Sequence, residues 1–306
     1  MQRFDFRALA MGLAFSLMWS SAFATARIIV ADAPPLWALT FRFALSGLIA
    51  VLLARALGQS WRLTRPVARS VVIFGLCQNA LYLGLNFIAL QWVEASLAAI
   101  IASAMPLIVA ALGWALGRDR VAPLGQLGLA LGFAGVALVM GTRVTGGADP
   151  MGLVFCSIGA TALAVATLTL RSVSAGGNLL MVVGLQMWVG SAALALVAAL
   201  TEPLTANLTL PLTLAFLYQV FIPGLAATVL WFALVKRVGA IRASTFHFLN
   251  PFFGVTVAAL LLDEAISPTD IAGVLIAMAG ILAVQLSRAA KVMRPPPAPS
   301  TPDPAP

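Results

Sequence analysis

The sequence is poor in charged side chains, in the titratable groups that enzymes use and in cysteine. Only 9% of its 306 residues are charged, and it holds ten Asp and Glu, one His and two Cys. By contrast, 61% of the residues are hydrophobic and the mean hydropathy is +1.02. A water-soluble domain cannot bury so much apolar surface. We therefore predict a protein of the lipid bilayer.

The same scarcity argues against catalysis and metal binding. An intramembrane enzyme needs paired carboxylates, a metal-binding cluster or a nucleophile with its base, and no Asp or Glu lies near the centre of an apolar run. Cys77 and Cys156 both lie inside such runs, which suggests neither a disulfide framework nor a metal site. We predict no enzymatic activity, no cofactor and no metal. The net charge of +8 is spread over short loops, so nucleic acid is not an expected partner.

Ten apolar runs are long enough to cross a hydrocarbon layer about 30 Å thick as helices. They cover residues 8–26, 35–54, 70–90, 95–116, 124–141, 152–170, 179–200, 212–235, 240–262 and 269–287. These runs lack the strict alternation of membrane β-strands, so the expected fold is an all-α membrane protein with ten transmembrane helices. A cleavable signal peptide is an alternative for the first run, but such a peptide would not form half of a repeat.

Positive charge indicates the orientation of the chain. With both termini in the cytoplasm, 15 of the 18 Lys and Arg fall in cytoplasmic loops or ends. Arg27 and Arg143 then lie outside, and Arg42 lies within a span. This asymmetry follows the positive-inside rule. We expect cytoplasmic N and C termini.

The chain also repeats itself at a spacing of about 145 residues. A shift of 145 aligns the later spans, and a shift of 144 aligns the beginnings, in the pairs Pro106 with Pro251, Pro123 with Pro268, Gly128 with Gly273, Gly135 with Gly280, Asp5 with Asp149 and Arg27 with Arg171. Each unit has five spans, so the second must enter the membrane from the opposite side. We predict two inverted five-helix repeats, residues 1–145 and 146–290, as in secondary transporters. A disordered, proline-rich cytoplasmic tail is expected over residues 291–306.

Several motifs follow one another in the first unit. They are the WSSAF of residues 19–23, Pro34 followed by Arg42, the alanine-rich span with Pro106, the GRDR of residues 117–120 and a glycine-spaced fifth span. In this order they resemble the EamA-type units of the drug/metabolite transporter superfamily, over residues 5–288. The likeness is greatest to the bacterial aromatic amino acid exporters (the YddG group), which implies a multi-pass protein of the bacterial inner (cytoplasmic) membrane. One departure is Leu163, which stands in the second unit where the first has its tryptophan.

Prolines interrupt three of the apolar runs, at Pro106, Pro223 and Pro251. A proline deprives the carbonyl four residues earlier of its helical partner, for example that of His247 before Pro251. Such a carbonyl cannot face lipid. We interpret the three prolines as candidate hinge or gating positions that face protein or water.

A polar stripe runs along the third apolar run. Gln78, Asn79, Tyr82 and Asn86 fall within one 100° arc at helical spacing. We interpret the stripe as the wall of a water-accessible cavity that binds substrate, with interhelical packing as the alternative. Trp19, near the middle of the first run, is a further candidate for the same cavity.

The ninth run contributes Phe246, His247 and Asn250 on one helix face. They are candidate substrate-binding residues, and hydrogen bonding to a neighbouring helix is the alternative. Arg42 is the only cation within a span. Snorkelling to the surface is the default expectation for it, and pairing with an anionic substrate group or capping a gate is the sharper one. Its repeat counterpart is Gln186.

Small residues form narrow stripes on the fifth and tenth runs, and we assign them to helix packing, within the chain or between subunits. They are Gly125, Gly128, Gly132, Gly135, Gly273, Ala277 and Gly280. A homodimer does not follow from them.

The candidate residues combine aromatic faces with amides and carry few charges. This chemistry suits a small amphipathic metabolite, and the resemblance points to export of amino acids, aromatic ones above all. The alternative is multidrug or organic-cation efflux, although a cation site would gain from a buried carboxylate and none is present. The lack of intramembrane carboxylates favours facilitated export down a gradient, or weak proton linkage through His247.

Overall fold

The computed structural model describes residues 5–117, 121–170 and 178–292. Within these ranges the chain is helical, contains no strand, and provides ten segments long and apolar enough to cross a membrane. The all-α fold with ten spans is thereby confirmed. The proline-rich tail beyond residue 292, Arg118 and Arg120 of the GRDR motif, and Arg171 lie outside the described residues.

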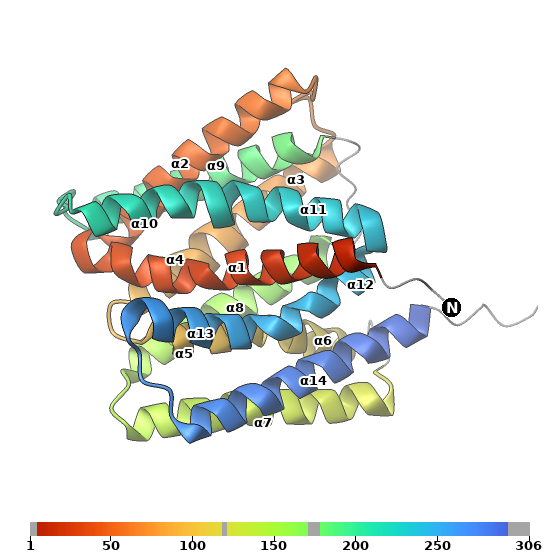
Figure 1. Ribbon diagram of the computed structural model, residues 1–306. Helices are drawn as coiled ribbons and strands as arrows, with labels where there is room; N and C mark the ends of the chain where they lie inside the picture. Colours follow the sequence, from red (N-terminus) through yellow and green to blue (C-terminus); the bar gives the residue numbers. More distant parts are fainter. Residues whose placement is uncertain (1–4, 118–120, 171–177, 293–306) are drawn as a thin grey trace, which may run out of the picture.

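The first five spans consist of α1 (Phe6–Asp32), α2 (Pro35–Ala56), the group α3 (Arg65–Phe74), η1 (Gly75–Tyr82) and α4 (Leu83–Ala89), the pair α5 (Ala95–Ser103) and α6 (Met105–Ala115), and α7 (Pro123–Thr145). The second five consist of α8 (Pro150–Leu170), α9 (Leu179–Thr201), the group α10 (Leu210–Phe221), η2 (Ile222–Ala226) and α11 (Ala227–Val238), the group α12 (Ala240–Thr245), η3 (Phe246–Leu249) and α13 (Asn250–Leu262), and α14 (Pro268–Val292). Figure 1 shows their arrangement.

The first span is longer than the apolar run predicts. Helix α1 continues past residue 26 to Asp32. Arg27 donates a hydrogen bond to the carbonyl of Leu90, and the Asp32 carboxylate accepts one from Thr209 at 2.7 Å. Hydropathy ends the run at these polar residues, but their tertiary partners allow the helix to continue.

The fifth spans of the two units show that the units are inverted. A Cβ atom on Gly128 would lie 2.8 Å from the carbonyl oxygen of Gly280, and one on Gly135 would lie 2.6 Å from that of Gly273. Residue numbers rise along α7 as they fall along α14, so these equivalent helices pack antiparallel. The glycine stripes therefore serve helix packing within the chain.

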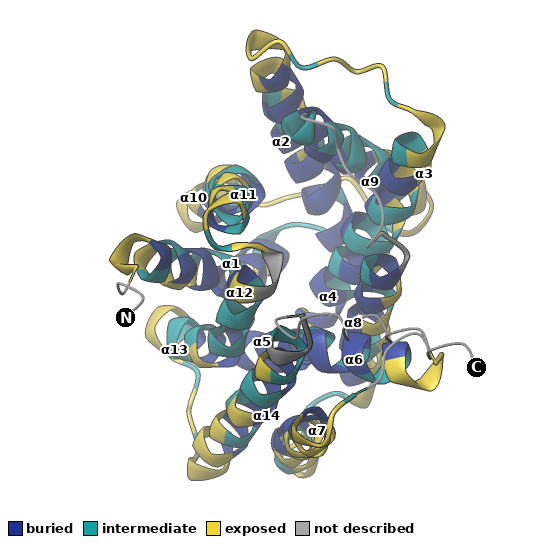
Figure 2. Cartoon of the chain, turned by 90° about the vertical axis from the view of Figure 1, so that its right-hand side faces the viewer, coloured by how far each residue is buried: buried dark blue, intermediate teal, exposed yellow. Residues whose placement is uncertain are grey.

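The second spans repeat the pattern at the opposite edge of the molecule (Figure 1). The Ser191 hydroxyl donates to the carbonyl of Thr40 at 2.9 Å, and the Trp188 indole N–H donates to that of Ala44 at 3.2 Å. Helices α2 and α9 are thus also antiparallel. Figure 2 looks along the helices and shows the buried residues facing the interior of the bundle, with exposed ones on its outside.

The third and fourth spans of each unit depart from regular α-helix at matching depths. Both third spans contain a π-helical segment, η1 in the first unit and η2 in the second. The fourth spans are interrupted before Pro106, between α5 and α6, and before Pro251, where η3 is a 3₁₀ turn. Irregular turns of this kind inside helices often mark functional sites.

Candidate functional site

A cavity of about 70 Å³ lies between the two units. Helices α1 and α2 and the third span of the first unit line it together with α9 and the third span of the second unit. Its walls are formed by Trp19, Ala22, Phe23, Ala26, Arg42, Phe43, Gln78, Asn79, Tyr82, Leu83, Asn86, Phe87, Leu90, Val183, Gln186, Met187, Pro223, Gly224 and Thr228. The cavity therefore combines aromatic rings, amides and one cation.

The predicted polar stripe forms one wall of this cavity. Gln78, Asn79, Tyr82 and Asn86 all line it. The Asn79 side-chain N–H donates to the carbonyl of Gln186 at 2.9 Å, and that of Asn86 donates to the carbonyl of Tyr82 at 2.7 Å. The stripe thus faces the cavity and also joins η1 to α9, so the two interpretations of it do not exclude each other.

The wall contributed by η2 and α11 is made of small residues. Pro223, Gly224 and Thr228 line the cavity there. A Cβ atom on Gly224 would lie 2.9 Å from the carbonyl oxygen of Gln219 and 3.0 Å from the hydroxyl of Ser46. Glycine at this position lets η2 approach α2 closely.

Trp19 lines the cavity beside Phe23, as the sequence predicts for Trp19. Behind Trp19 lies an aromatic cluster, in which Phe15 packs against Trp19, Trp231 and His247 with ring centroids 5.8, 4.8 and 5.4 Å apart. The cluster fixes the position of Trp19 on the side away from the cavity.

The ninth-span candidates lie outside the cavity wall. The His247 ring is packed between Phe15 and Trp231, and Phe246 lies against Gly12 of α1. Asn250 is buried, and its carbonyl accepts a hydrogen bond from Ser20. The structure gives these three residues a place in the contact between α1 and the ninth span, which agrees with the alternative of hydrogen bonding and packing against a neighbouring helix.

The structure also corrects the expected effect of Pro251. The carbonyl of His247 is not left without a partner, because the 3₁₀ turn η3 lets it accept the backbone N–H of Asn250. Pro106 and Pro251 are buried at the beginnings of α6 and α13, and neither lines the cavity. Of the three prolines, Pro223 alone belongs to the cavity wall.

The expectation that Arg42 snorkels to the surface is wrong. Its side chain is 5% exposed, and it lines the cavity with its guanidinium 5.1 Å from the centre of the Phe43 ring. Gln186, its repeat counterpart, lines the cavity as well. Sequence reasoning did not single out Gln186, Phe23 or Thr228 for the site, although the repeat alignment with Arg42 was a usable signal for Gln186.

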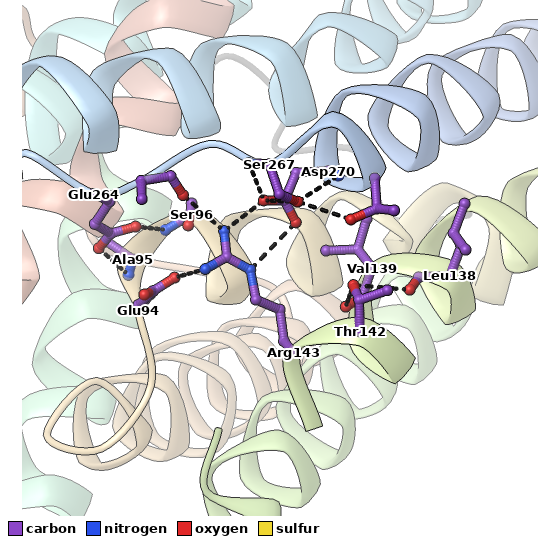
Figure 3. A network of polar contacts seen from close by, with 12 residues as sticks. Glu94, Ala95, Ser96, Leu138, Val139, Thr142, Arg143, Glu264, Ser267 and Asp270 are labelled. Atoms are coloured by element: carbon purple, nitrogen blue, oxygen red, sulfur yellow. Dashed lines mark hydrogen bonds and ion pairs between the residues drawn. The ribbon is translucent and has the colours of Figure 1, made fainter. Parts of the chain in front are cut away.

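A second polar cluster lies at one end of α7, outside the cavity (Figure 3). Arg143 forms ion pairs with Glu94, which precedes α5, and with Asp270 of α14 at 2.7 Å. It also donates to the carbonyl of Ala265 at 3.2 Å. One arginine thus joins the fourth and fifth spans of the first unit to the loop between the last two spans.

Burial raises the pKa of the Glu94 carboxyl, and Arg143 only partly offsets this because Glu264 and Asp270 add negative charge nearby. Glu264 accepts hydrogen bonds from two backbone N–H groups at the start of α5, at 2.7 and 3.0 Å. This cluster stabilises helix ends. In the described ranges, no three His, Cys, Asp or Glu residues are grouped so that they could hold a metal ion.

Comparison with known proteins agrees with this architecture. The profile of the EamA-like transporter family matches residues 6–141 and 150–286. The chain is 26% identical over 272 residues to the uncharacterized transporter YvbV of Bacillus subtilis, covering 88% of each chain. It is 25% identical over 273 residues to the protein PecM of Dickeya dadantii, covering 88% of this chain and 89% of that one. A solved crystal structure shares the fold, with a TM-score of 0.67 at 22% identity over 93% of this chain and 99% of the other. The chain belongs to the EamA-like transporter family and is a multi-pass membrane transporter of small molecules.

Proposed function

We propose that this transporter exports small amphipathic metabolites, foremost amino acids and among these the aromatic ones, across a bacterial inner membrane. The observation that carries the proposal is the composition of the central cavity. Trp19, Phe23 and Tyr82 offer ring faces to a flat apolar group, and the amides of Gln78 and Gln186 offer hydrogen bonds to a polar one. Aromatic and polar groups placed together in this way are typical of small-molecule sites.

Alternating access is the mechanism that this architecture supports. Residues 1–145 and 146–290 would rock against each other about the cavity, as inverted repeats do in secondary transporters. A volume of about 70 Å³ admits only a few water molecules. The walls must therefore separate before an amino acid can enter, and the irregular turns η1 and η2 are placed where such movement would bend the third spans.

A wider space lies near one end of the central cavity. It measures about 700 Å³ and lies at the end of the molecule where α1 turns into α2, with Asp32, Gln91 and Glu202 in its walls. Leu90 of the central cavity is adjacent in sequence to Gln91. With cytoplasmic termini this end faces outward, so we interpret the space as the exit for exported substrate.

Energetically, facilitated export down a concentration gradient fits best. No carboxylate lines the cavity in the described part of the chain, and His247 lies behind Trp19 rather than in the wall. The measurement is substrate uptake into proteoliposomes with and without a pH gradient. We expect little dependence on the gradient. Strong dependence that is lost in His247→Ala would indicate proton linkage through His247 instead, and strong dependence that persists in this variant would contradict both alternatives.

Substrate competition in the same proteoliposomes tests the proposal directly. Uptake of radiolabelled tryptophan should be inhibited by aromatic amino acids and not by sugars or by a lipophilic organic cation. Trp19→Ala should reduce uptake, whereas Trp114→Ala should not, because Trp114 is 49% exposed on the outside of the bundle. Inhibition by organic cations with no inhibition by amino acids would favour multidrug efflux instead, although the positive charge of Arg42 in the wall disfavours it.

A further inference from the structure

The central cavity contains a buried positive charge that no group of the described residues neutralises. Arg42 is 5% exposed, and its Nε and Nη1 atoms have no hydrogen-bond partner among the described residues. The guanidinium lies over the face of the Phe43 ring. A buried guanidinium that leaves two of its nitrogen atoms without hydrogen bonds is strongly unfavourable in a membrane protein.

No carboxylate of the described chain is available to neutralise it. The described Asp and Glu residues lie at helix ends, and none lines the cavity. Asp5 is paired with Arg237, and Glu94 and Asp270 are paired with Arg143. An anion that neutralises Arg42 must therefore enter the cavity from outside the protein.

Resting on the proposed role of the cavity, we propose that Arg42 binds the carboxylate of the transported molecule and selects substrates that carry one. The planar guanidinium matches a carboxylate in shape and charge. A single cation suits a group of one negative charge, whereas a phosphate dianion would call for more than one. The Gln186 and Gln78 amides in the same walls can hydrogen-bond further polar atoms of the substrate.

Only one of the two repeat-related positions in the cavity carries a positive charge. Its counterpart Gln186 keeps a hydrogen-bonding side chain in the cavity but carries no charge. The carboxylate is thereby held against α2 of the first unit, while the aromatic faces of Trp19 and Tyr82 remain for the rest of the molecule. Substrate orientation in the cavity follows from this asymmetry.

A matched pair of ligands tests the proposal. Tryptophan and tryptophan amide share the ring and the amine and differ in the carboxylate. The readout is the ratio of the concentrations at which each inhibits uptake of radiolabelled tryptophan into proteoliposomes, which does not depend on the amount of active protein. Wild type should favour the acid by about tenfold or more. Arg42→Gln should bring the ratio close to one, and Arg42→Lys should give an intermediate value.

Controls separate this inference from the proposed function. Arg55→Gln removes a cation from the exposed end of the same helix and should leave the ratio unchanged. If Arg42→Gln does not fold, the inhibition ratios of wild type and of Arg42→Lys still show whether Arg42 selects for the carboxylate. A wild type that transports aromatic amino acids yet favours neither ligand would overturn the role of Arg42 and leave the proposed function standing. If neither ligand inhibits tryptophan uptake by the wild-type protein, the proposed function itself would be overturned.

Discussion

The third spans of the two units have a similar backbone conformation but different side chains. Both contain a π-helical segment, η1 and η2, and both segments line the central cavity. The first presents Gln78 and Asn79, and the second presents Pro223 and Gly224 at the corresponding positions. The comparison indicates that the repeat preserved the geometry that allows a helix to bend, whereas the amide side chains on this pair of segments come from the first unit alone.

The other paired positions follow the same division. Arg42 lines the cavity together with its uncharged counterpart Gln186. Trp19 lines the cavity, whereas Leu163, which replaces it in the second unit, is buried elsewhere. The first unit therefore supplies most of the aromatic and polar side chains of the cavity wall, and small residues of the second unit, such as Gly224, allow the close approach of helices.

The largest expected effect concerns the seam between α7 and α14, where the two units are alike. In Gly135→Leu, the Cβ atom would lie 2.5 Å from the backbone nitrogen of Ala277, so the helices must separate. We expect loss of folded protein, measured by size-exclusion chromatography in detergent.

Gly141→Leu on the same helix is the matched control for this substitution, because a Cβ atom there meets nothing within 4 Å. It should behave as wild type. Folded Gly135→Leu protein would show that the units do not depend on this close antiparallel contact.

A medium effect is expected from substitutions in the two cavity walls. Gln78→Leu removes a half-buried amide from the polar wall and should weaken substrate binding by about tenfold, or about 1.4 kcal/mol. Thr228→Val changes the opposite wall, where the hydroxyl already donates to the carbonyl of Gly224 at 3.1 Å. It should change binding by less than about twofold. Half-saturation concentrations for uptake measure both, and equal effects would contradict the one-sided site.

The smallest effect concerns side chains of each unit that accept hydrogen bonds from the N-terminus of a helix in the other unit. Glu202 accepts the backbone N–H groups of Leu36 and Trp37 at 3.0 and 3.2 Å, and Gln59 accepts that of Met181 at 3.0 Å. Burial raises the pKa of Glu202 despite these hydrogen bonds. The native state then binds the proton more tightly than the unfolded chain, so this carboxyl contributes most stability at low pH and loses it as pH rises.

Glu202→Gln removes this titration. The unfolding temperature of the variant relative to wild type should therefore rise between about pH 4 and about pH 7. Gln59→Ala should shift the unfolding temperature equally at both pH values, since no titrating group is lost. A difference between Glu202→Gln and wild type that does not vary with pH would show that Glu202 is not destabilised in its charged form.

Much of the fold was predictable because membrane insertion depends on local composition. Runs such as 95–116 and 179–200 coincide with helices to within a residue, because proline or a polar turn limits them. Where the prediction fell short, a distant partner was responsible. The first run ends at residue 26 by hydropathy, yet α1 reaches Asp32 because Thr209 accommodates its carboxylate.

The site was predictable in part for the same reason. Helical spacing places Gln78, Asn79, Tyr82 and Asn86 on one face regardless of what that face meets. Spacing could not show that His247 packs between Phe15 and Trp231 instead of lining the cavity. Nor could it show that Arg42 turns inward, because snorkelling and pointing into a cavity begin from the same position on a helix.

The amino-acid sequence alone determined that the protein lies in a lipid bilayer, that it has ten spans and that it contains a repeat. Hydrophobicity and helix-breaking residues are properties of neighbouring positions, and the repeat is found by aligning the sequence with itself at a fixed shift. Folding in three dimensions was required to place the units antiparallel in contact, to enclose the cavity and to choose which polar groups face it. Those outcomes depend on close approach between helices far apart in the chain, such as Gly224 against Ser46 and Asn79 against Gln186. A contact of that kind is decided by the shapes of both surfaces, and a linear pattern describes one surface at a time.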